Sequence, residues 1–215
     1  DFTNADLSYT KLFSVDFSMI KNKDLSTAKL LGTGMGFSDL RGVEMPNEIL
    51  YTNLENANMN GIDFTDRRVI GGVFADTHMQ NADLSNANLS PITFDKILYD
   101  FGPYPPIGIP ENEIQRFIIS KSDANLWTIW ATLNLISVEP VGNDLHVKYL
   151  LYNSMQSVDL SNANLRDANL IYVDFYNANL SNANLSNSIL LRAYLLNANL
   201  EGANLEGANL EGANL

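Results

Sequence analysis

Residues 158–215 read V-D-L-S-N A-N-L-R-D A-N-L-I-Y V-D-F-Y-N A-N-L-S-N A-N-L-S-N S-I-L-L-R A-Y-L-L-N A-N-L-E-G A-N-L-E-G A-N-L-E-G A-N-L. Leu or Phe fills every fifth position from Leu160 to Leu215, and a small residue, usually Ala, stands two places before most of them. A helix needs apolar residues every 3.6 positions and a strand every second one, so this period fits neither. Five-residue sides that bury one large and one small side chain and then turn a corner are expected to wind into a solenoid.

The same period runs from Phe2 to Phe94, with two shifts of register. The first lengthens one side by three residues through Met19–Lys23, and the second falls near Pro46, with Ile49 as the central residue. Each shift predicts a bulge or a small loop at a corner. We expect a buried column formed by the central residues, among them Leu7, Phe17, Phe64, Phe74, Leu84, Leu160, Leu165, Leu170, Phe175, Leu180, Leu185, Leu200 and Leu205.

The repeat resembles that of the pentapeptide-repeat family, whose consensus is A-(D/N)-L-x-x, over roughly residues 2–94 and 155–215. The resemblance implies an all-β fold, a right-handed quadrilateral β-helix with four pentapeptides to a coil. In that fold the Leu or Phe and the preceding Ala point inward. Counting the sides in fours predicts about eight coils, five before residue 95 and three after residue 154.

The chain is therefore expected to have three parts: N-terminal coils over 1–94, an inserted module over 95–154, and C-terminal coils over 155–215 that continue the first set. Prolines in the segment 103–106 exclude a central strand or helix there. A helix is expected over 110–118, and residues 145–152 alternate apolar and polar as a strand does. Residues 126–138 fit either a helix or a strand, and we favour a β-hairpin.

The charge balance limits the choice of partners. There are 13 Lys and Arg against 25 Asp and Glu, which gives a net charge of −12. Such a surface repels nucleic-acid phosphates, so no direct nucleic-acid binding is expected, and it favours basic partners or serves solubility alone. The chain has no cysteine and no apolar run long enough for a transmembrane segment. A cytoplasmic location is favoured, and a processed lumenal or periplasmic form stays open because the sequence opens at Asp1 rather than Met.

The polar residues suggest structure rather than chemistry. Asp or Asn precedes most central residues, and stacked side chains of this kind can hydrogen-bond along the axis and to corner backbone. Calcium is the alternative, but most members of this ladder are neutral Asn. His78 and His146 have no nucleophile or second His at motif spacing. We therefore predict no catalytic residue, no metal site, no cofactor and no enzymatic activity.

The insertion is the expected functional element. It carries Tyr104, Trp127 and Trp130, and aromatic residues are enriched at binding hot spots. Arg67 and Arg68 are further candidates for partner contact. Arg67 occupies a slot that is normally small and inward, so we expect the backbone to bulge there and both arginines to face water.

These observations predict a non-enzymatic acidic solenoid scaffold for protein–protein interaction, with a protein partner engaged by the insertion. The resemblance implies an alternative, since some members of the family mimic DNA and protect a type II topoisomerase such as gyrase. The last repeat, A-N-L at 213–215, shows no cap, which predicts possible end-to-end self-association through the C-terminal coil.

Overall fold

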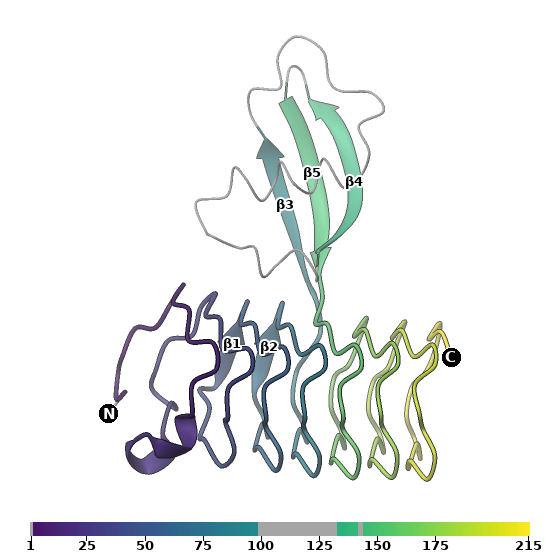
Figure 1. Cartoon of the computed structure of the whole chain (residues 1–215). Helices are drawn as coiled ribbons and strands as arrows, with labels where there is room; N and C mark the ends of the chain where they lie inside the picture. The colour runs from purple at the N-terminus through teal and green to yellow at the C-terminus, as the bar shows by residue number, and fades with distance from the viewer. Residues whose placement is uncertain (1, 99–132, 142–143) are drawn as a thin grey trace.

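The computed structural model describes residues 2–98, 133–141 and 144–215. The repeats form a rod of stacked coils, and a three-stranded sheet projects from the side of the rod between its N-terminal and C-terminal parts (Figure 1). The elements within the described residues are two 3-10 turns and five strands: η1 (Phe17–Met19), η2 (Lys21–Lys23), β1 (Glu48–Leu50), β2 (Arg68–Ile70), β3 (Ile92–Leu98), β4 (Leu133–Val141) and β5 (Asp144–Leu151).

Parallel bridges twenty residues apart define the coil. Asn164 bridges Asn184, and Asn184 bridges Asn204, so four five-residue sides complete one turn of the rod. On one face of the described rod the bridges connect eight successive rungs, at Lys11, Gly34, Asn53, Val73, Ser154, Asp174, Tyr194 and Asn214. The predicted pentapeptide-repeat fold is confirmed.

Most corners have one residue with positive φ, and the sequence supplies residues that tolerate it. Asn81, Asn86 and Asn162 have φ of 58°, 57° and 58°, while Gly202 has 69°. Asn and Gly adopt this left-handed conformation more readily than other residues. The third residue after a central one then donates its N–H back, as Ala87 N does to Leu84 O at 3.0 Å, which closes the corner.

The central residues form one column along the rod axis. Ten of the expected core residues are fully buried: Phe17, Phe64, Phe74, Leu84, Leu160, Leu165, Leu170, Phe175, Leu180 and Leu185. Leu7, Leu200 and Leu205 were also expected in the core, but they are only partly buried. They belong to the first and last coils described, and each of these coils has a neighbouring coil on one side only.

Both register shifts are present, but only the first adds residues at a corner as expected; the second shortens a side instead of adding a bulge. Asp6 bridges Lys29, twenty-three residues later, and the three extra residues lie in the η1–η2 segment. Asp39 bridges Asn58 after nineteen residues, because the side between Met45 and the fully buried Ile49 is one residue shorter. The coils absorb both changes without losing the column.

The insertion leaves one face of the rod and returns on the next. Its strands are ordered β3-β5-β4 and both pairings are antiparallel, with Ile92 opposite Leu151 at the base. Phe94 was expected to centre the last repeat before the insertion, but it lies within β3, so Leu89 is the last regular central residue. The stack continues across the gap, since Val73 bridges Ser154. The helix expected over 110–118 lies outside the described residues.

Replacing one core residue tests the column. Leu180→Asp places a carboxylate in a fully buried slot, and the cost of several kcal/mol should unfold the neighbouring coils. Asn182→Asp in the same repeat is the control, because Asn182 is exposed at a corner where Asp is tolerated. A thermal melt of Leu180→Asp that matches the control contradicts the buried column.

Outward aspartates should make the rod sensitive to acid. The hydroxyl and N–H of Ser26 lower the pKa of Asp24, and the N–H and hydroxyl of Thr65 lower that of Asp63. The folded state therefore binds these protons less readily than the unfolded chain does. The contribution to stability is complete above the ordinary pKa of about 3.9 and is lost as pH falls through the lower folded-state values. Carboxyl titration by NMR should find both pKa values below that of an unfolded-chain Asp, and equal values would refute the effect.

Candidate interaction surface

A buried side chain bonds the rod at the point where the chain returns from the insertion. Asn153 has no exposed surface, and its Nδ2 donates to Val69 O at 3.0 Å and Leu89 O at 2.8 Å. Its Oδ1 accepts from Gly72 N at 2.8 Å. In a regular corner a main-chain N–H donates to the central carbonyl, so the Asn153 amide replaces two of those donors at the break in the repeat. A Cβ on Gly72 would lie 2.5 Å from Phe74 Cε2, so this close packing requires glycine.

One corner of the rod differs from the others. We call it the insertion corner, because the chain leaves the rod there at Ser90 and returns at Tyr152. The positions directly after the central residues are apolar on both sides of the insertion, at Leu31, Leu50, Ile70, Ile171 and Leu191. The corresponding positions of the next corner but one hold Asn60, Gln80, Ser161 and Ser181, which are polar. Apolar side chains therefore follow the corner that carries the insertion.

Tyrosines gather on the C-terminal side of the insertion. Tyr176 and Tyr194 stack with ring centroids 6.1 Å apart at an interplanar angle of 30°. The Arg192 guanidinium lies 5.7 Å from the Tyr172 ring centre, and its Nη1 donates to the Tyr172 hydroxyl. We call Tyr152, Tyr172, Tyr176, Arg192 and Tyr194 the tyrosine patch.

Tyr152 connects this patch to the base of the insertion. Burial raises the pKa of its hydroxyl, and the carboxylate of Asp174 raises it further. The phenol is therefore held in its neutral form, which can donate a hydrogen bond.

Bulky residues occupy strained corner positions along the insertion corner. Tyr9, Tyr51, Tyr172 and Arg192 have φ of 59°, 54°, 56° and 55°, where other corners mostly have Asn, Asp, Ser or Gly. Large side chains in this region are uncommon, and such positions cluster at functional sites. Folding alone does not require Tyr or Arg here, because Asn serves the same role elsewhere in the rod.

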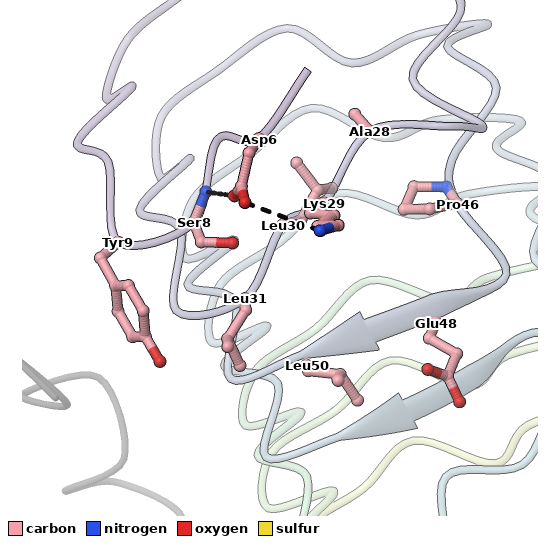
Figure 2. A pocket seen from close by; sticks show the side chains of 10 residues that line it. All are labelled: Asp6, Ser8, Tyr9, Ala28, Lys29, Leu30, Leu31, Pro46, Glu48 and Leu50. Carbon is pink, nitrogen blue, oxygen red and sulfur yellow. Dashed lines mark hydrogen bonds and ion pairs between the residues drawn. The ribbon is translucent and has the colours of Figure 1, made fainter. Parts of the chain in front are cut away.

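A hollow of about 550 Å³ lies on the N-terminal side of the insertion corner. Its lining is partly apolar, with Tyr9, Leu31 and Leu50, and partly charged, with Asp6, Lys29 and Glu48 (Figure 2). Lys29 Nζ lies 3.8 Å from Asp6 Oδ2, so the hollow carries charges of both signs.

Four acidic residues form a column on a different face. The outward column formed by Asp24, Glu44, Asp63 and Asp83 continues with neutral residues, namely Asn164, Asn184 and Asn204. Asp39 bridges Asn58 on the preceding face. Glu44 and Asp63 stand five residues after these two, so they also belong to successive rungs. This acidic column thus spans four rungs in the N-terminal half and ends at the level of the insertion.

The two predicted arginines differ in their surroundings. Arg68 is exposed, as predicted, and its Nη1 lies 3.2 Å from Glu48 Oε1. The backbone bulge predicted at Arg67 is wrong, since Arg67 N donates to Phe64 O at 3.0 Å as in a regular corner. These main-chain bonds hold Arg67 in the inward slot, so its Nε is buried without a hydrogen bond and only the end of the side chain reaches Thr65 O.

The aromatic candidates Tyr104, Trp127 and Trp130 lie outside the described residues, so their role stays a prediction. The tyrosine patch was not predicted. Its signal in the sequence is a departure from the S-N and E-G pairs that follow most central residues: I-Y at 171–172, Y-N at 176–177 and L-R at 191–192. The stacking of residues twenty apart brings these departures together.

In the part of the chain that the structure describes, no group of three or more His, Cys, Asp or Glu side chains is placed to hold a metal ion. Across the same residues, no helix has the length and apolar character needed to cross a bilayer.

Comparisons with known proteins agree with the repeat. The family profile described as "Pentapeptide repeats (8 copies)" matches residues 154–187 and 178–215. The C-terminal coils, residues 154–215, thus carry the repeats of the pentapeptide-repeat family. A comparison with curated proteins finds no match.

Similar solved structures include HetL, a pentapeptide repeat protein involved in heterocyst differentiation regulation from the cyanobacterium Nostoc sp. strain PCC 7120. It shares 18% identity over 100% of this chain and 89% of its own, with a TM-score of 0.31. Rfr23 from the cyanobacterium Cyanothece 51142 shares 17% sequence identity, and the match covers 97% of this chain and 90% of Rfr23, with a TM-score of 0.29. Full-length QnrB1, a plasmid-mediated fluoroquinolone resistance protein, shares 15% sequence identity. The match covers 98% of this chain and 84% of QnrB1, with a TM-score of 0.31. Scores of this size do not establish a common arrangement, and the family assignment rests on the repeats.

Removing the Asn153 amide tests the junction. Asn153→Ala leaves two carbonyls and one N–H buried without these partners, so we expect a loss of roughly 2–4 kcal/mol in the free energy of unfolding. Asn47→Ala is the control, because Asn47 is exposed on another coil and does not have a positive φ. Denaturant unfolding measures both, and equal stabilities would show that the amide does not hold the junction.

Proposed function

We propose that this protein is a non-enzymatic scaffold that binds a protein partner through the insertion and the adjoining tyrosine patch. The observation that carries the proposal is that the insertion and the Tyr172–Arg192 pair lie at the same corner of the rod, with Tyr194 on the face that follows it. Tyr172, Arg192 and Tyr194 replace the Asn, Ser and Gly of the surrounding repeats only one to two rungs from the place where the insertion returns.

The chemistry of the patch suits a protein surface. Tyr and Arg are the residues most enriched among binding hot spots, together with Trp. A stacked tyrosine pair presents a rigid apolar area with hydroxyls at its edge, and it loses little conformational freedom on binding. The regular rod fixes the distance between the patch and the base of the insertion, so one partner can contact both.

Replacing patch residues by the family consensus separates binding from folding. In the double variant Tyr172→Asn and Tyr194→Asn, both positions receive the Asn that the next repeat along the chain carries, at Asn177 and Asn199, so the melting temperature should change little. Capture of the partner from cell extract should fall by about tenfold or more. Arg166→Ser with Asp167→Asn is the control, because it introduces the S-N pair of the consensus at an exposed corner outside the patch.

The insertion is tested in the same assay with Trp127→Ala and Trp130→Ala. If either residue anchors the partner, capture should weaken by roughly 2 kcal/mol or more while the melt of the rod stays unchanged. Capture that survives both the tryptophan and the tyrosine variants argues against the proposed surface. Equal loss in the control would instead show that capture does not depend on the tyrosine patch.

Mimicry of DNA toward a type II topoisomerase is the second candidate, and the four-rung column Asp24, Glu44, Asp63 and Asp83 is the observation that favours it. A phosphate-like stripe has to be continuous, whereas this column continues as Asn for the remaining rungs. We therefore expect no inhibition of gyrase supercoiling and no rescue from quinolones at stoichiometric protein. A clear effect that weakens with added salt would place this function first.

A further inference from the structure

Four charged residues of alternating sign form a ladder on the face that precedes the insertion corner. Asp6, Lys29, Glu48 and Arg68 occupy the same outward position on four successive rungs. Asp6 bridges Lys29, and Glu48 pairs with Arg68 across β1 and β2. Gly32 N donates to Leu50 O, which places the rung of Lys29 beside the rung of Glu48. The order along the rod is therefore minus, plus, minus, plus.

All four side chains are open to solvent. Their exposed fractions are 60% for Asp6, 75% for Lys29, 57% for Glu48 and 51% for Arg68. Within the chain they form two ion pairs, at 3.8 Å and 3.2 Å. Exposed pairs of this kind contribute little stability individually, so the ladder is not explained by the needs of folding.

Apolar residues run beside the ladder. Leu31 and Leu50, both half-buried, follow the central residues of two of these rungs and line the hollow with Lys29 and Glu48 (Figure 2). Ile70 has the same position in the fourth rung, but it is buried. A charged column next to an apolar column is an arrangement typical of a recognition surface, in which apolar burial gives affinity and charge fixes the register.

The sequence of signs determines which partner fits. Minus, plus, minus, plus becomes its own complement when it is reversed. We propose that this face binds a second copy of the chain, related by a twofold axis that runs along the strands between the Lys29 and Glu48 rungs. Asp6 then meets Arg68 of the partner subunit, and Lys29 meets Glu48 of the partner subunit.

The same operation brings the apolar columns together. Leu31 faces Leu50 of the partner subunit, and the reverse contact follows from the symmetry, as in any isologous interface. The rung that holds Ser90 lies outside the four paired rungs, so each insertion is displaced from the contact. The acidic column of Asp24, Glu44, Asp63 and Asp83 cannot serve the same purpose, because two copies would oppose like charges.

Charge reversal tests the proposal on the full chain. Sedimentation velocity at low salt should show the dimer in exchange with the monomer, and the dimer fraction should fall as salt rises from about 0.05 M to about 0.5 M. The double variant Lys29→Glu and Arg68→Glu makes the ladder acidic throughout and should lower the association constant by roughly tenfold or more. Thermal melts of the variants check that the rod stays folded.

The matched control is Arg41→Glu with Arg166→Glu. It changes the net charge by the same amount and also breaks two exposed ion pairs, with Asp39 and Asp167, but it lies on other faces and should leave the dimer intact. The fourfold variant Asp6→Lys, Lys29→Glu, Glu48→Lys and Arg68→Glu inverts every sign, remains complementary to itself, and should dimerise again. A monomer at about 100 μM in low salt, or equal loss in the control, overturns the proposal, as does failure of the fourfold variant to dimerise while its melt is unchanged.

Discussion

The main-chain hydrogen bonds between successive coils are the constraint on which the rest of this structure depends. Most central residues donate their N–H to a carbonyl of the next coil, as Leu165 N does to Asn184 O at 2.7 Å. Because each rung pairs with the next in parallel register, side chains twenty residues apart form straight columns along the rod. A single substitution changes one point in a column, whereas substitutions at intervals of one coil create a continuous surface. The acidic column, the charge ladder and the tyrosine patch are all surfaces of this kind.

The same constraint explains how the rod accepts an insertion. A coil is defined by bonds to its neighbours, so the chain can leave at a corner provided that the interrupted bonds find other partners. The main-chain bond from Ser154 N to Gly72 O restores the rung, and the side-chain amide of Asn153 satisfies the carbonyls of Val69 and Leu89. The insertion is thereby held at a fixed position on the rod, beside the tyrosine patch. Position, rather than chemistry at a pocket, is what this architecture provides for a partner.

Much of the fold could be predicted from the sequence because the five-residue period is a local signal. The central residues, the extra residues before Leu25 and the shortened side at Ile49 follow from counting alone. The conformation of Arg67 did not follow from the sequence. The cost of burying its charge favoured a bulge, but the main-chain bonds between rungs keep the backbone regular there. The surface was harder to predict, since Tyr172 and Arg192 become neighbours only once the coil is known to contain twenty residues. The junction at Asn153 could not be predicted, because its partners are 64 to 84 residues away.

The central claim is that one continuous rod carries the insertion as an addition at a single corner. Amide hydrogen exchange on a variant in which a short Gly/Ser bridge replaces residues 92–151, with Asn153 retained, tests this claim most directly. The account predicts that Phe74 N and Ser154 N, which form the rung across the junction, stay as protected as Leu165 N in both the parent and the variant. Selective loss of protection at Phe74 and Ser154, with Leu165 unchanged, would show two separate solenoids held together by the insertion and would contradict the account.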